Sequence, residues 1–183
     1  METCTSALLS KVSETMNCIF DSCRPPKKHD DLSNEEEDSN ATESRKEELK
    51  QLVGIFAARA QTFIPCTRIQ LETETFVKSQ YRLDSELRVL TVQTEDKVLD
   101  IPLANVKAVY GFHDTEGTEH QGELMKLDII KGLDDTQKER LAVVEFVHDG
   151  REGQIMLMEE EVHSSDAFIT VMRMLMIHAT KEN

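Results

Sequence analysis

The sequence has no tryptophan, and aromatic residues make up only 5% of its 183 positions. A groove that stacks sugars or ligands on aromatic rings is therefore not expected. The sequence also lacks any apolar run near the roughly 18 residues that a helix needs to span a bilayer. No positive residues precede the short apolar pair Leu8 and Leu9, so we expect no secretory signal and a cytosolic setting.

Positive charge is scarce as well. The chain has 21 Lys and Arg residues against 35 Asp and Glu residues, which gives a formal net charge of -14. Non-specific nucleic-acid binding needs clustered cations that displace counterions, so this class of function is excluded. Attraction to anionic lipid also requires a basic patch that is separated from the acidic remainder.

Cysteines are few, and their spacing forms no metal motif. The four are Cys4, Cys18, Cys23 and Cys66, with no CxxC pair. In a reducing compartment no disulfide framework is expected. There is also no glycine-rich phosphate loop. The sequence therefore predicts no metal site and no cofactor.

Composition divides the chain into three zones. Residues 1–24 form an amphipathic segment that ends at Pro25 and Pro26, because proline cannot continue a helix. Residues 25–43 are polar and acidic, and we predict a disordered linker there. Residues 44–180 have the pattern of a folded domain. The apolar positions of the first zone are spaced by three or four residues, at Leu8, Val12, Met16, Ile19 and Cys23.

The third zone begins and ends with predicted helices. Ser44 and Glu47 have the spacing of a capping box, which predicts a helix from there to about residue 61. At the other end, Ser164 or Ser165 is expected to cap an amphipathic helix. Its apolar stripe comprises Phe168, Val171, Met172, Leu175, Met176 and Ala179.

Between these helices the hydrophobic period changes to two, which predicts strands. Asp149-Gly150 marks a hairpin whose loop we expect to extend through Gly153. The sequence predicts about seven strands, one of which is the apolar stretch LMKLDII between two polar loops. The others are CTRIQLETE, FVKSQYRLD, LRVLTVQ, Val98 to about Val109, LAVVEFVHD and GQIMLMEEE.

This order of elements defines an expected fold class. It is α+β and mainly β: a pleckstrin-homology-like barrel of about seven antiparallel strands, capped by a C-terminal helix. The helix before the first strand is an addition to that core. In such a barrel the last helix covers one open corner of the sheet.

Two sets of residues in the folded zone are candidate sites. Lys78, Arg82 and Arg88 resemble the cations with which some pleckstrin-homology domains hold phosphoinositides, although outward-facing charges are the simpler interpretation. Cys66 is a nucleophile candidate, but no histidine stands in a recognisable motif with it. We therefore expect Cys66 to be a small buried residue and the protein not to be an enzyme.

The N-terminal cysteines suggest a membrane anchor. Cysteines within or beside an amphipathic helix are candidate palmitoylation sites, and an acyl chain plus a helix gives a stable anchor. Cys23 lies on the apolar stripe, Cys18 lies near its edge, and Cys4 lies near the end. The alternative is a helix that docks on its own domain or on a partner.

Four segments resemble a known family. They are IPC at 64–66, YRLDSELRVLTV at 81–92, IPLANVKAVY at 101–110, and the terminal DAFITVMRMLMIH. The stretch from about 50 to 180 resembles the pleckstrin-homology-like domain of the inner membrane complex sub-compartment proteins of apicomplexan parasites and related alveolates.

The resemblance implies a small peripheral protein held by N-terminal acylation on the flattened sacs beneath the plasma membrane. The implied domain is a protein-interaction module with a role in cortical organisation and daughter-cell construction, and its protein partners and oligomeric state stay open. Members of the family typically begin Met-Gly, whereas Glu2 stands here, which rules out myristoylation of that position. Anchoring would then depend on Cys4, Cys18 and Cys23, or a cytoplasmic protein would reach the cortex through partners.

Overall fold

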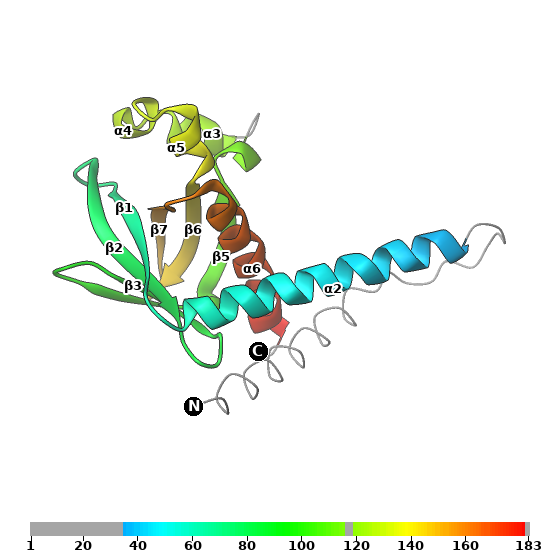
Figure 1. The fold of residues 1–183 in the computed structure, drawn as a ribbon. Helices are drawn as coiled ribbons and strands as arrows, with labels where there is room; N and C mark the ends of the chain where they lie inside the picture. Colours follow the sequence, from blue (N-terminus) through cyan, green and yellow to red (C-terminus); the bar gives the residue numbers. More distant parts are fainter. Residues whose placement is uncertain (1–34, 116–118, 182–183) are drawn as a thin grey trace. The chain divides into compact units, whose positions relative to one another are not determined.

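The computed structural model describes residues 35–115 and 119–181. Helix α2 (Glu35–Ala60) comes first, and the chain divides into two units between Ala58 and Arg59. The second unit contains all the strands of the described part and the helix α6 (Val162–Lys181) (Figure 1). The expected N-terminal helix is therefore present, although it begins at Glu35 rather than at Ser44.

A single antiparallel sheet of seven strands forms the second unit, in the order β4-β3-β2-β1-β7-β6-β5. The predicted mainly β fold, with seven antiparallel strands and a C-terminal helix, is confirmed. The two strands at the ends of this order, β4 and β5, do not pair with each other, so hydrogen bonds do not close the barrel. The strands are β1 (Ile64–Gln70), β2 (Thr75–Leu83), β3 (Val89–Gln93), β4 (Val98–Pro102), β5 (Val106–Gly111), β6 (Leu141–His148) and β7 (Arg151–Met158).

The predicted number of seven strands is confirmed, but two of the predicted strands are wrong. The stretch from Val98 to Val109 is two strands, because Pro102 ends β4 and the 3-10 helix η1 (Leu103–Asn105) follows. Strand β5 then pairs with β6 instead of β3. The stretch LMKLDII is not a strand: it lies in short helices between β5 and β6. These elements are η2 (His113–Thr115), α3 (Glu119–Leu124), α4 (Asp128–Lys131) and α5 (Asp135–Glu139).

The hairpin between β6 and β7 is tighter than expected. His148 pairs with Arg151, so Asp149 and Gly150 alone form the turn. Both have positive φ, 51° and 73°, as a type I′ hairpin turn requires. The predicted longer loop through Gly153 is therefore wrong, since Gly153 lies inside β7 and pairs with Phe146.

One face of the sheet packs against α6. Phe168 is fully buried, and its ring meets that of Tyr81 on β2 edge to face, with centroids 5.0 Å apart. On β5, a Cβ on Gly111 would lie 3.1 Å from Ile169 of α6, so the backbone approaches the helix closely there. Helix α6 thus packs on β5, β6 and η1 and reaches β2 through Phe168, so it covers this face of the sheet as the fold class predicts (Figure 1). It begins at Val162 rather than after a Ser164 or Ser165 cap.

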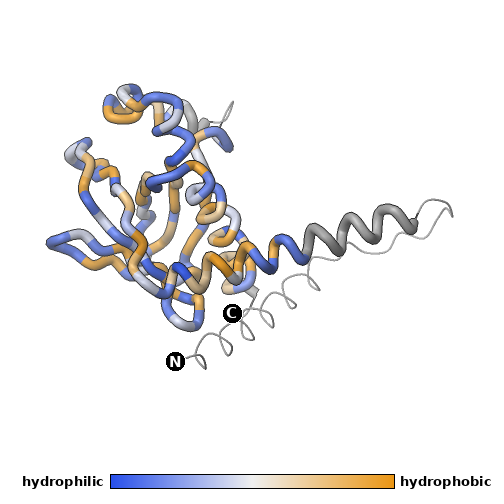
Figure 2. Tube along the Cα trace, viewed as in Figure 1, coloured by the Kyte–Doolittle hydropathy of each residue, from blue (hydrophilic) through white to orange (hydrophobic). Residues whose placement is uncertain are grey.

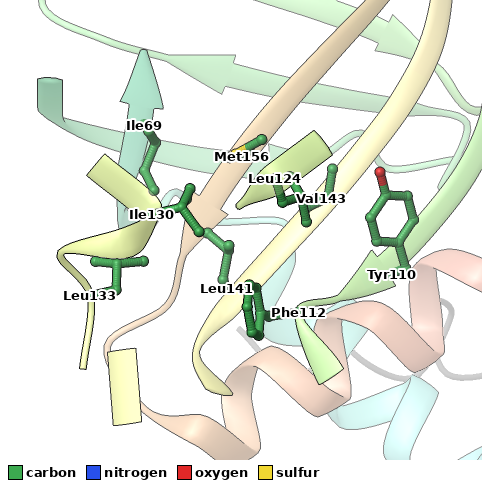
Figure 3. Close-up of a cluster of buried hydrophobic side chains, with 9 residues drawn as sticks. All are labelled: Ile69, Tyr110, Phe112, Leu124, Ile130, Leu133, Leu141, Val143 and Met156. Atoms are coloured by element: carbon green, nitrogen blue, oxygen red, sulfur yellow. The ribbon is translucent and has the colours of Figure 1, made fainter. Parts of the chain in front are cut away.

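The opposite face carries a second cluster of buried apolar residues, which the segment with α3, α4 and α5 covers (Figure 3). Strand β6 contributes Leu141 and Val143 to this cluster and buries Ala142 and Val144 on the other side. Covered on both faces, β6 reads as a nearly continuous apolar run, whereas most of the second half of β2 is hydrophilic and its residues alternate in burial (Figure 2). The cluster comprises Ile69, Tyr110, Phe112, Leu124, Ile130, Leu133, Leu141, Val143 and Met156.

Candidate functional site

The predicted acylation sites Cys4, Cys18 and Cys23 lie outside the described residues, as do the amphipathic segment and residues 25–34 of the linker. Their roles stay predictions. No helix in the described part of the chain is long and apolar enough to cross a membrane.

Two of the three head-group candidates share a surface. Lys78 and Arg82 are exposed on β2, while Ser79 and Tyr81 between them are buried, so both cations project from the outward face. Four residues of strand separate their Cα atoms by about 13 Å. The Arg82 guanidinium lies over the Phe63 ring, 4.7 Å from its centroid. That contact fixes the guanidinium partly through a cation–π interaction.

A cavity of about 300 Å³ lies beside Lys78, between the middle of β2 and the end of β3. Neither Arg82 nor Arg88 lines it, and Glu95 contributes a carboxylate to its wall. Arg88 lies before β3, with Nε 3.8 Å from the Glu86 carboxylate. The lining residues are Pro65, Lys78, Ser79, Gln80, Gln93, Thr94 and Glu95. This cavity therefore offers an anionic head group one cation and one opposing carboxylate.

A second cavity, of about 260 Å³, lies where β5, η2, α5 and α6 meet. Arg173, which lines it, was not among the residues predicted from the sequence. Arg173 of α6 donates from Nε to the Val109 carbonyl at 2.6 Å and from Nη2 to the Asp114 carboxylate at 2.8 Å. The same Asp114 oxygen accepts the Gly111 amide at 2.9 Å. These bonds fasten α6 to the end of β5, which is a structural role.

Cys66 has the environment of a structural residue. It is 7% exposed, and burial raises the pKa of its thiol to about 12, with a further contribution from the Glu159 carboxylate. A catalytic cysteine needs the opposite shift, because the thiolate is the nucleophile. Within the described residues, no group of three His, Cys, Asp or Glu side chains is placed to hold a metal ion.

The most unusual buried side chain is the carboxyl group of Glu159, which was not among the site residues predicted from the sequence. It is 2% exposed, and burial raises the pKa of its carboxyl above the ordinary value of 4.5. A signal was present in GQIMLMEEE, because Glu159 continues the alternation of the buried residues Ile155 and Leu157.

The fold and these sites define a pleckstrin-homology-like domain with a mixed-charge outward face rather than a strongly basic pocket. No protein-family model and no curated protein sequence matches the chain. Among solved structures it is similar to Inner Membrane Complex Sub-compartment Protein 1 from Toxoplasma gondii, with a TM-score of 0.52. That match has 14% sequence identity and covers 82% of this chain and 99% of the other.

Weaker structural matches accompany it. Inner Membrane Complex Sub-compartment Protein 3 from Toxoplasma gondii has a TM-score of 0.46 and 15% identity, over 73% of this chain and 86% of the other. PLC21 from L. pealei has a TM-score of 0.47 and 9% identity, over 63% of this chain and 15% of the other. The resemblance noted in the sequence is thus confirmed as a likeness of fold to Sub-compartment Protein 1.

Proposed function

We propose that this chain is a non-enzymatic, membrane-associated adaptor of the cell cortex, which uses its pleckstrin-homology-like domain to bind other proteins. The observation that supports this most is the fold shared with Sub-compartment Protein 1 over 99% of that chain. We extend to this chain the location that the name of that protein gives, the inner membrane complex, and we place it on the cytosolic side of the membrane. Its proposed role is cortical organisation and cell division.

The folded unit itself fits an interaction module better than a catalyst. The single described cysteine is buried, and its raised thiol pKa favours the protonated form. In one cavity the Arg173 guanidinium forms an ion pair with Asp114, and in the other Lys78 and Glu95 both line the wall. The outward face of β2 to β4 exposes large apolar side chains, with Phe76 at 50% and Val98 at 61%. These are the first positions to substitute when a protein partner is sought.

Anchoring is proposed to come from acylation of Cys4, Cys18 and Cys23, because a single weak membrane signal does not hold a protein stably. The test is hydroxylamine-sensitive acyl labelling of the full chain and of the three Cys→Ser variants. We expect the label on the wild type and a loss of most of it in the variant with all three replaced. Cys66→Ser is the matched control and should keep the full label, since its thiol is buried.

An unlabelled wild-type chain would contradict the anchor. It would leave a cytoplasmic adaptor that reaches the cortex through its partners, so the two parts of the proposal are separable.

Phosphoinositide binding by Lys78, Arg82 and Arg88 is the second candidate, favoured by the shared outward face of Lys78 and Arg82. Flotation with phosphoinositide vesicles tests it. If the site exists, Lys78→Ala and Arg82→Ala each weaken binding, while Lys107→Ala, on β5, does not. Equal flotation of all variants would dismiss the head-group site.

A further inference from the structure

A carboxyl group lies buried in the interior of the sheet, beside the Tyr81 hydroxyl of β2. Glu159 directly follows β7, and neither its Oε1 nor its Oε2 has a hydrogen bond of good geometry within the described chain, although the Tyr81 hydroxyl is near enough to lower the pKa of the carboxyl. Thr67 of β1 pairs with Met158, so the next pair along the ladder brings Cys66 opposite Glu159. An unpaired carboxylate is costly to bury, so this position favours the neutral acid.

Several charged or titratable groups face this carboxyl. Burial is the main cause of its raised pKa. The Tyr81 hydroxyl on β2 and the Arg59 guanidinium lower this pKa, and the Glu160 charge raises it further. Tyr81 is itself 1% exposed, and its pKa is raised by burial and by the charge of Glu159. Neither partner therefore compensates an ionised Glu159 fully.

Two arginines near Glu159 donate hydrogen bonds to other acceptors, and a third has a buried nitrogen without an acceptor. Arg59 donates from Nη1 to Ser164 Oγ at 3.3 Å, and Arg140 donates from Nη1 to the Glu160 carbonyl at 2.9 Å. On β1, Arg68 buries its Nε without a hydrogen-bond partner among the described residues.

Glu159 lies at a structural junction. Its amide donates to the Arg140 carbonyl at 3.0 Å, which ties the end of β7 to the start of β6. Helix α6 begins at Val162, and the Ser165 hydroxyl in its first turn is fully buried without a partner in the described chain. A change in the hydration of Glu159 therefore acts where β7 passes into α6.

We propose that Glu159 is a proton-controlled switch, which holds the junction of β7 and α6 closed as a neutral acid and loosens it when ionised. On ionisation the carboxyl O–H bond breaks and the proton passes to solvent water. The carboxylate then draws in water or the Arg59 guanidinium, and Ser164 loses its bond to Arg59.

The direction of the pH effect follows from linkage. The pKa of Glu159 is higher in the folded than in the unfolded chain, so its contribution to stability is complete below about pH 4.5. That contribution is lost as the pH rises through the folded-state pKa. Ordinary paired carboxylates act in the opposite direction, so mild acidification should tighten this junction while it weakens surface ion pairs.

The test is a ¹³C NMR titration of the Glu159 side-chain carboxyl in the full chain, together with amide exchange at Ser164 and Ser165. We expect Glu159 to titrate above 4.5, and protection of these two amides to fall about tenfold per pH unit between the unfolded and folded pKa values. Protection is compared after correction for intrinsic exchange.

Glu159→Gln keeps the shape and removes the charge, so the fall in protection that Glu159 causes should be absent from this variant over that window. Glu160→Gln is the matched control, because Glu160 is exposed. It should keep the pH dependence of the wild type at a slightly lower pH, since the Glu160 charge raises the pKa of Glu159. A Glu159 titration at or below 4.5 would overturn the proposal. So would equal pH dependence in the wild type and Glu159→Gln.

Discussion

Replacement of Ile130 by alanine tests whether the segment between β5 and β6 truly covers the outer face of the sheet. Ile130 lies on the four-residue helix α4, is fully buried, and packs in the cluster with Ile69 and Leu133 (Figure 3). The substitution removes three carbon atoms at about 0.8 kcal/mol each, or about 2.4 kcal/mol of transfer free energy. The cavity left behind raises the expected loss to about 3 kcal/mol.

Urea denaturation measures this loss. With a slope of about 1–3 kcal/mol per M, a loss of about 3 kcal/mol lowers the midpoint by roughly 1–3 M. Ile129→Ala is the matched control, because the neighbouring Ile129 is only partly buried and should cost clearly less. Equal, small losses in both variants would refute the packing of this segment on the sheet.

Two further predictions concern the turn and the buried thiol. Gly150→Ala should cost about 1–2 kcal/mol in urea denaturation, because Gly150 has a φ of 73°, whereas Gly122→Ala, with open space at its Cβ, should not destabilise. Equal midpoints for the two variants would argue against the type I′ turn. Cys66, with a pKa of about 12, should resist iodoacetamide at pH 8 in a chain whose other cysteines are serine, and react once urea unfolds it. Rapid labelling of the folded chain would contradict its burial.

Strand β2 was predictable because it exposes one face. On β2, Ser79, Tyr81 and Leu83 are buried while Lys78 and Arg82 are exposed, which is the alternation that the sequence displays. The apolar stripe of the last helix was equally clear, since Phe168, Val171, Met172 and Leu175 are all buried.

Other elements depend on tertiary contacts that no local pattern encodes. In LMKLDII, Leu124 and Ile130 suit a strand as well as a helix, and the buried cluster beneath α4 decides in favour of short helices. The early start of α2 had no apolar signal, because Ala41 is the only apolar residue in the sequence from 35 to 43. Glutamate nevertheless has a high helix propensity, and that propensity agrees with the longer helix.

The candidate site was only partly predictable. The sequence placed Lys78 and Arg82 on one face, but it did not reveal that Phe63 and Glu86 engage Arg82 and Arg88. Glu159 was overlooked, because a glutamate in a run of three is ordinarily solvent-exposed. Its burial follows from the β1–β7 pairing, which a single sequence does not specify.

The most direct test of the proposed function is the location of the fluorescently tagged full chain in an apicomplexan cell. We expect a cortical signal beneath the plasma membrane that becomes diffuse when Cys4, Cys18 and Cys23 are all replaced by serine. Cys66→Ser should leave the cortical signal unchanged. A wild-type chain that is diffuse throughout the cell cycle would contradict a cortical adaptor.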